Sequence, residues 1–164
     1  MTARLEASGS VYAQIAGASF GLIADDGKTV FELQATPGSN GAALTVALGG
    51  FASVSAASVL VQYSSGLGVS LSDGVAPTLS VGGVSHQYSG AIAAGTVAFA
   101  LKGMSASVSE FVTLSGDVGF SKVGSQIVAT GSGVTAKLAA SADVYAQITG
   151  ASFGLMAEAN KTVF

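Results

Sequence analysis

A repeat with a period of 133 residues constrains the fold of this chain more than any other sequence feature. Residues 2–31 read TARLEASGSVYAQIAGASFGLIADDGKTVF and residues 135–164 read TAKLAASADVYAQITGASFGLMAEANKTVF, without a gap and with 21 of 30 positions identical. Such self-similarity is typical of repeat architectures, in which each unit packs on its neighbours. We therefore expect residues 2–134 to be one full repeat and residues 135–164 to begin the next. Met1 is interpreted as an initiator added to a section of a longer array.

The differences between the two copies indicate a turn. Asp26–Gly27 in the first copy faces Ala159–Asn160 in the second. Gly and Asn adopt positive φ more readily than other residues, and Asp-Gly between two β-like segments is typical of a hairpin. The same reasoning applies elsewhere in the chain. The residues that we predict to form turns are Asp26, Gly27, Asp73, Gly74, Gly124 and Asn160.

The segments between these turns read as β-strands. Residues 11–24 and 29–35 are rich in β-branched and aromatic side chains, and a second hairpin is expected between residues 67–71 and 77–81. About ten short strands with frequent turn signals predict an all-β fold. Because an array needs complementary edges, we expect an elongated stack of antiparallel strands and hairpins, a rod of β-sandwich or solenoid type. The large side chains expected to form its core are Phe20, Phe31, Phe51, Tyr63, Phe99, Phe111, Phe120 and Phe153.

The composition argues against several classes of function. Charged residues make up 9% of the chain and the net charge is −3, whereas a nucleic-acid surface needs clustered Lys and Arg. One His and no Cys can form neither a disulfide framework nor an ordinary zinc site. Apolar runs fall short of the roughly 20 residues of a membrane-spanning helix. We therefore expect no nucleic-acid partner and no membrane insertion.

Candidate catalytic and metal-binding residues are sparse. We interpret His86 as a hydrogen-bonded or solvated strand residue, because nothing in its sequence context marks it as catalytic. A calcium site or a glycosidase pair would need carboxylates, but both Glu6 and Asp26 are replaced by Ala in the second copy. We predict no enzyme, no small-molecule substrate and no cofactor, with structural calcium as the alternative. The carboxylates are Glu6, Asp25, Asp26, Glu32, Asp73, Glu110, Asp117, Asp143 and Glu158.

Two stretches resemble a known kind of sequence. LSGDVGFSKVGSQIVATGSGVTAKL at residues 114–138, followed by VYAQITGASFGL, is similar to the long β-rich tandem repeats of giant bacterial surface and secreted proteins. In those repeats an LSGDF-like strand, a short turn and an alternating strand follow in this order. The resemblance covers most of the period. It implies an extracellular or cell-surface location and an adhesive or scaffolding role, and it implies no catalytic residue.

The function predicted from these observations is structural. We expect a repeat unit of a very large extracellular bacterial protein, which assembles head to tail into a fibre through contacts that do not close. Its partners would be copies of itself or adjacent repeats. One alternative is a ligand-binding adhesin repeat that faces a glycan or an ice surface. A further alternative is a fragment of a membrane β-barrel, for which strands of about 10 residues and aromatic girdles are expected.

Overall fold

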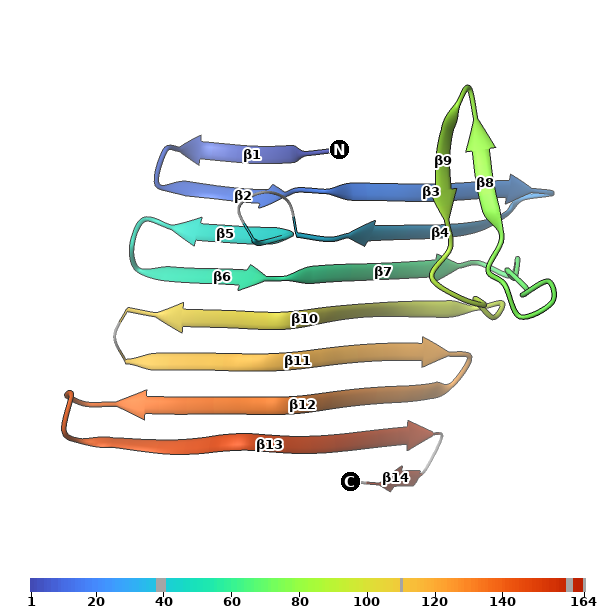
Figure 1. Ribbon diagram of the computed structural model, residues 1–164. Helices are drawn as coiled ribbons and strands as arrows, with labels where there is room; N and C mark the ends of the chain where they lie inside the picture. Colours follow the sequence, from blue (N-terminus) through green and yellow to red (C-terminus); the bar gives the residue numbers. More distant parts are fainter. Residues whose placement is uncertain (38–40, 110, 159–160, 164) are drawn as a thin grey trace.

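The chain forms one open, 12-stranded sheet with a two-stranded hairpin beside it (Figure 1). The computed structural model describes residues 1–37, 41–109, 111–158 and 161–163. The predicted all-β fold of antiparallel strands and hairpins is confirmed. The strands are β1 (Ala3–Ser8), β2 (Val11–Ile15), β3 (Ala18–Asp25), β4 (Lys28–Ala35), β5 (Leu44–Leu48), β6 (Ala52–Ala56), β7 (Ser58–Ser64), β8 (Thr78–Val81), β9 (Val84–Gln87), β10 (Thr96–Val108), β11 (Val112–Val123), β12 (Gln126–Ala139), β13 (Tyr145–Glu158) and β14 (Lys161–Val163).

The first strands lie end to end in pairs, whereas the later ones span the whole width of the sheet. β2 and β3 form one line that is interrupted at Gly17, where φ is 65°. β5 and β4 share the next line, because β5 pairs with β2 and β6 while β4 pairs with β3 and β7. β10 then pairs with both β6 and β7. From β10 to β13 each strand has 12 to 14 residues and the sheet continues at full width.

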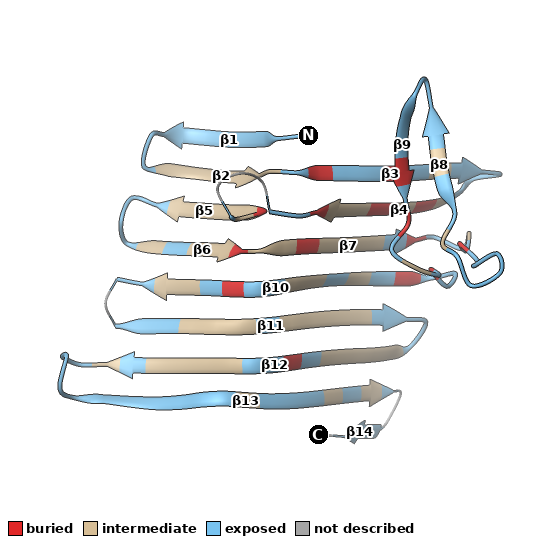
Figure 2. Cartoon of the chain, in the orientation of Figure 1, coloured by how far each residue is buried: buried red, intermediate tan, exposed pale blue. Residues whose placement is uncertain are grey.

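Buried residues concentrate where the β8–β9 hairpin and its flanking segments lie over β3, β4 and β7 (Figure 2). One cluster joins Val30 of β4 to Val69, Tyr88 and Ile92 of these covering segments. A second cluster consists of small residues near the junction of the paired strands, including Ala18 and Ala35. β13, in contrast, is exposed along most of its length. The core is therefore local, and most of the sheet is a single layer.

The expectation that the large aromatic side chains form the core is wrong. Six of the eight are exposed, and the fraction ranges from 44% for Tyr63 to 64% for Phe51. Two of the six, Phe51 and Phe111, lie in turns just before β6 and β11. For the four that lie in strands, the physical reason is the single layer: among the described residues, no second sheet packs on the face opposite the hairpin. Alternation along a strand indicates two different faces, but it does not indicate that both are covered. The exposed six are Phe20, Phe51, Tyr63, Phe99, Phe111 and Phe153; Phe31 and Phe120 are partly buried.

The second predicted hairpin is also corrected. The two segments on either side of Asp73–Gly74 do not pair with each other in a ladder. Val69 of the first segment bridges instead to Ile92, and the second segment largely forms β8, which pairs with β9. The hairpin turn lies at Gly82–Gly83, where φ is 60° and 83°. Two adjacent glycines accept these positive angles without a steric cost, which favours a two-residue hairpin turn at this position.

Candidate functional site

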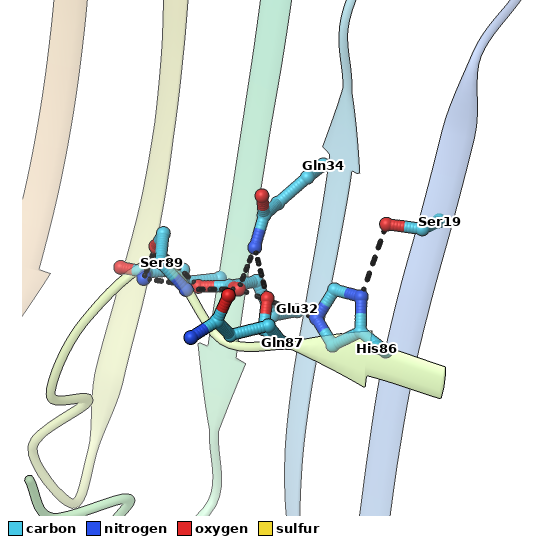
Figure 3. A network of polar contacts seen from close by, with 7 residues as sticks. Ser19, Glu32, Gln34, His86, Gln87 and Ser89 are labelled. Atoms are coloured by element: carbon cyan, nitrogen blue, oxygen red, sulfur yellow. Dashed lines mark hydrogen bonds and ion pairs between the residues drawn. The ribbon is translucent and has the colours of Figure 1, made fainter. Parts of the chain in front are cut away.

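A buried carboxylate occupies the centre of the contact between the hairpin and the sheet (Figure 3). Glu32 of β4 has no exposed surface. Its Oε1 accepts hydrogen bonds from Gln34 Nε2 at 2.6 Å and from the Ser89 backbone N–H at 2.8 Å. Its Oε2 accepts from Gln62 Nε2 at 2.7 Å and from Ser89 Oγ at 2.6 Å. A buried charge needs such partners, and here they come from β4, β7 and the segment after β9.

His86 of β9 extends the same network toward β3. Its Nδ1 lies 3.1 Å from Ser19 Oγ, and its Nε2 lies 3.3 Å from Glu32 Oε1. The imidazole is buried and meets the ring of Tyr88 edge-on, with 5.1 Å between ring centroids. Serine, histidine and carboxylate follow in the order of a nucleophilic triad, but His86 Nε2 makes no hydrogen bond within the described part of the chain. In this chain the carboxylate already accepts four hydrogen bonds, and the geometry supports a network that fastens the hairpin to the sheet.

The network changes the acid–base properties of two groups. Burial raises the pKa of Glu32, but hydrogen bonds from Gln62, Ser89 and Gln34 outweigh it, so the pKa lies below its ordinary value of 4.5. Burial and, second, the negative charge of Glu32 raise the pKa of the Tyr88 phenol above 10.0. The Tyr88 hydroxyl oxygen has no hydrogen-bond partner within the described part of the chain. Glu32 is therefore held as a carboxylate in the folded protein.

An apolar groove of about 500 Å³ runs between the hairpin and the outer edge of β3. Phe20 and Leu22 of β3 line it together with Val81 and Val84, which flank the turn of the hairpin. The groove lies where β3 has a strand on one side only, since within the described residues β3 pairs with β4 alone. At the start of this edge Met1 exchanges two backbone hydrogen bonds with Ala18, each of 2.9 Å. Beyond Ala18 the edge is open to a further strand.

The residues predicted to form turns lie in turns with positive φ where the structure describes them. Asp26 and Gly27 connect β3 to β4 with φ of 44° and 70°, and Gly124 follows β11 with φ of 59°. Asp73 and Gly74, with φ of 52° and 78°, make an isolated tight turn in the loop before β8. These angles are the ones that turn residues adopt. Asn160 lies outside the described residues.

Replacing Gly27 by alanine is expected to lower the free energy of unfolding by about 1 kcal/mol, because a Cβ is strained at this positive φ even where space is open. No heavy atom of the described residues lies within 4 Å of the Cβ that would be added. Chemical denaturation measures the change. Gly9→Ala is the control, since the second copy already has Ala142 at the corresponding position. Equal losses in the two variants would contradict the assignment of strain to Gly27.

The two copies of the repeat pair in the same register at opposite edges of the sheet. β1 pairs with β2 so that Ala3 opposes Ile15, and the end of β12 pairs with the start of β13 so that Ala136 opposes Ile148. The ladder between β13 and β14 likewise repeats that between β3 and β4. The second copy therefore folds as the first does, although its surroundings in the sheet differ.

A side-chain contact is repeated as well. The Arg4 guanidinium carbon lies 3.9 Å from the centroid of the Tyr12 ring, and the Lys137 Nζ lies 4.3 Å from that of Tyr145. Both are cation–π contacts between positions that correspond across the repeat. Conservative replacement of Arg by Lys keeps the contact, which strengthens the equivalence of the two copies.

The described residues contain no group of three or more His, Asp or Glu side chains placed to hold a metal ion. They also contain no helix long and apolar enough to cross a membrane. The fold defines an all-β protein built on one open antiparallel sheet. None of the protein-family models, curated proteins and solved structures compared with the chain matches it.

Proposed function

We propose that this chain is a structural repeat unit of a very large extracellular or cell-surface bacterial protein, whose repeats stack head to tail into a β-rich rod that serves as a scaffold or in adhesion. The second copy carries the proposal. It adopts the register of the first copy at the opposite edge of the sheet, which is where the next repeat of a rod begins. The resemblance of residues 114–138 to the tandem repeats of giant bacterial surface and secreted proteins supports the extracellular or cell-surface location.

The topology of the sheet supports continuous stacking. From β1 to the corresponding part of β12 the sheet advances by six strand positions, along β1-β2-β5-β6-β10-β11-β12. An even number of antiparallel steps returns the chain to the same direction, so a next repeat continues the sheet without reversal. At about 4.8 Å per step, each repeat lengthens the rod by roughly 29 Å. The partners of a repeat are then its two neighbours.

The distribution of burial agrees with this role. The strands from β11 onward are supported by their neighbours within the sheet rather than by a second layer. In a solenoid-like array, the free energy of unfolding is approximately the sum of a contribution from each repeat and a contribution from each contact between neighbouring repeats. Each repeat is therefore stabilised by the repeats on either side of it. The Glu32 network then has a structural role, because it fixes one hairpin to each unit.

The proposal is tested by inserting further copies of residues 2–134 in tandem ahead of residues 135–164. Each added period is expected to lengthen the particle by roughly 29 Å, because six strands are added at about 4.8 Å each. Small-angle scattering and electron microscopy measure the length, and the chain described here is the control. Separate globular bodies joined by linkers, or a length that does not grow with the number of periods, would contradict the proposal.

A further inference from the structure

The two edges of the sheet have complementary steps. At one edge β1 lies outermost beside β2, while β3, the continuation of β2, is open beyond Ala18, which is hydrogen-bonded to the Met1 backbone (Figure 1). At the other edge β14 lies outermost beside the last residues of β13, while the first half of β13 is open. Each open segment has no strand partner among the described residues. One edge therefore protrudes where the other is recessed.

We propose that a second copy of this chain binds across these steps. β1 of the first copy then pairs with the first half of β13 of the second copy, and β14 of the second copy pairs with the end of β3 of the first. The proposal rests on the proposed function, because it names the partner and the register by which separate chains stack. The two protruding strands then share one row of a continuous sheet, and no strand of either copy is displaced.

The sequence of the repeat fixes the register on the β1 side. Residues 144–148 read VYAQI, as do residues 11–15, with which β1 already pairs. In the proposed contact, the outer side of β1 thus meets the same sequence as its inner side. Ala3 lies opposite Ile148 of the other copy, and Leu5 lies opposite Ala146 of the other copy. β2 and β13 run in the same direction (Figure 1), so β1 is antiparallel to both. Antiparallel strands direct alternate backbone groups to either side, and the two ladders are therefore in phase.

The same relation holds on the β14 side. Within one chain Lys161 opposes Glu158 and Val163 opposes Met156. Across the repeat, Glu158 corresponds to Asp25 and Met156 to Ile23. In the proposed contact, Asp25 and Ile23 of the neighbouring copy therefore face Lys161 and Val163 on the outer side of β14. Lys161 then lies between two carboxylates of opposite charge to its own. An exposed pair of this kind stabilises by little, but it disfavours a shifted register.

The contact is heterologous and does not close, so it extends into a filament. Its axial repeat differs from that of the covalent array. From β1 of one copy to β1 of the next the path β1-β2-β5-β6-β10-β11-β12-β13 and the shared row give eight steps, or roughly 38 Å at about 4.8 Å each. In an alternative filament, residues 135–164 of one copy would take the place of residues 2–31 of the next. Its axial repeat would be roughly 29 Å, as in the covalent array.

Disulfide trapping in the full chain tests the register. The chain has no Cys of its own, and Leu5 and residue 146 lie at opposite edges of the sheet, too far apart to bridge within one molecule. We expect oxidised L5C/A146C to form a ladder of covalent multimers, because cross-strand neighbours bring their Cβ atoms within disulfide reach. In the matched control L5C/Q147C the second thiol points to the other face, and roughly tenfold less product is expected.

The outcomes separate the two proposals. A ladder from L5C/A146C with little from the control, and filaments with a repeat near 38 Å in electron micrographs, support the stepped contact. A monomer from both variants, equal ladders from both, or filaments with a repeat near 29 Å overturn it. If the tandem chains still lengthen by one increment per period in that case, only the stepped contact fails. If they do not lengthen, the proposed function fails.

Discussion

Replacement of Glu32 by glutamine is expected to lower the free energy of unfolding at neutral pH by about 1–3 kcal/mol. The carboxylate accepts hydrogen bonds at both oxygens from Gln34, Gln62 and Ser89. A glutamine amide at this position turns one acceptor into a donor that faces other donors, and a buried polar group without a partner costs about 1–3 kcal/mol. Denaturant unfolding followed by circular dichroism measures the change.

The effect of Glu32 depends on pH in a defined direction. Because the pKa of Glu32 is lowered in the folded protein, its contribution to stability is fully present above the ordinary value of 4.5 and is lost as the pH falls through the lowered pKa. The difference between the parent chain and Glu32→Gln should therefore be constant near pH 7 and shrink on acidification. Glu6→Gln is the control, because Glu6 is exposed and, among the described residues, forms an ion pair with Arg4 alone at the surface. A difference that is the same at pH 7 and at pH 3 would contradict this account.

Local features of the fold could be predicted from the sequence. The Asp26–Gly27 turn between two β-like segments is a short-range signal, and the structure places β3 and β4 around it. The equivalence of the two copies is also local, since the same residues meet the same neighbours within each copy. The strands from residue 96 onward follow each other with short connections, so each strand pairs with the next one along the chain. The alternation of apolar and polar residues is sufficient to predict such strands.

The site where the hairpin meets the sheet could not be predicted in this way. Glu32 and His86 lie 54 positions apart and come together only because the β8–β9 hairpin folds across β3. A weak signal existed in the sequence: Gln62-Tyr63-Ser64 recurs as Gln87-Tyr88-Ser89, and both triplets supply partners to the carboxylate. A carboxylate in the middle of an apolar strand was the other signal, because a buried charge requires partners from elsewhere.

Gly21 and Gly154 occupy corresponding positions in the two copies, and the same substitution is expected to destabilise the chain at Gly21 but not at Gly154. A Cβ at Gly21 would lie 2.5 Å from His86 Cδ2 and 3.1 Å from the Tyr88 ring, whereas a Cβ at Gly154 meets no described heavy atom within 4 Å. Gly21→Ala should destabilise by about 1–3 kcal/mol, because the hairpin is displaced from the sheet. Gly154→Ala should be neutral or stabilise by up to about 1 kcal/mol, because glycine is unfavourable in a strand. Thermal unfolding of the two variants measures both effects.

The matched pair also links the site to the proposed rod. If each repeat places its own hairpin over the strand that corresponds to β3, then in a chain with one further complete period the hairpin of the second repeat covers the position of Gly154. The Gly154→Ala substitution, harmless in the present chain, should then cost as much as Gly21→Ala. Similar losses at both sites already in the present chain would contradict the open environment of Gly154. A Gly154→Ala variant that stays neutral in the longer chain would contradict a repeating unit that includes the hairpin.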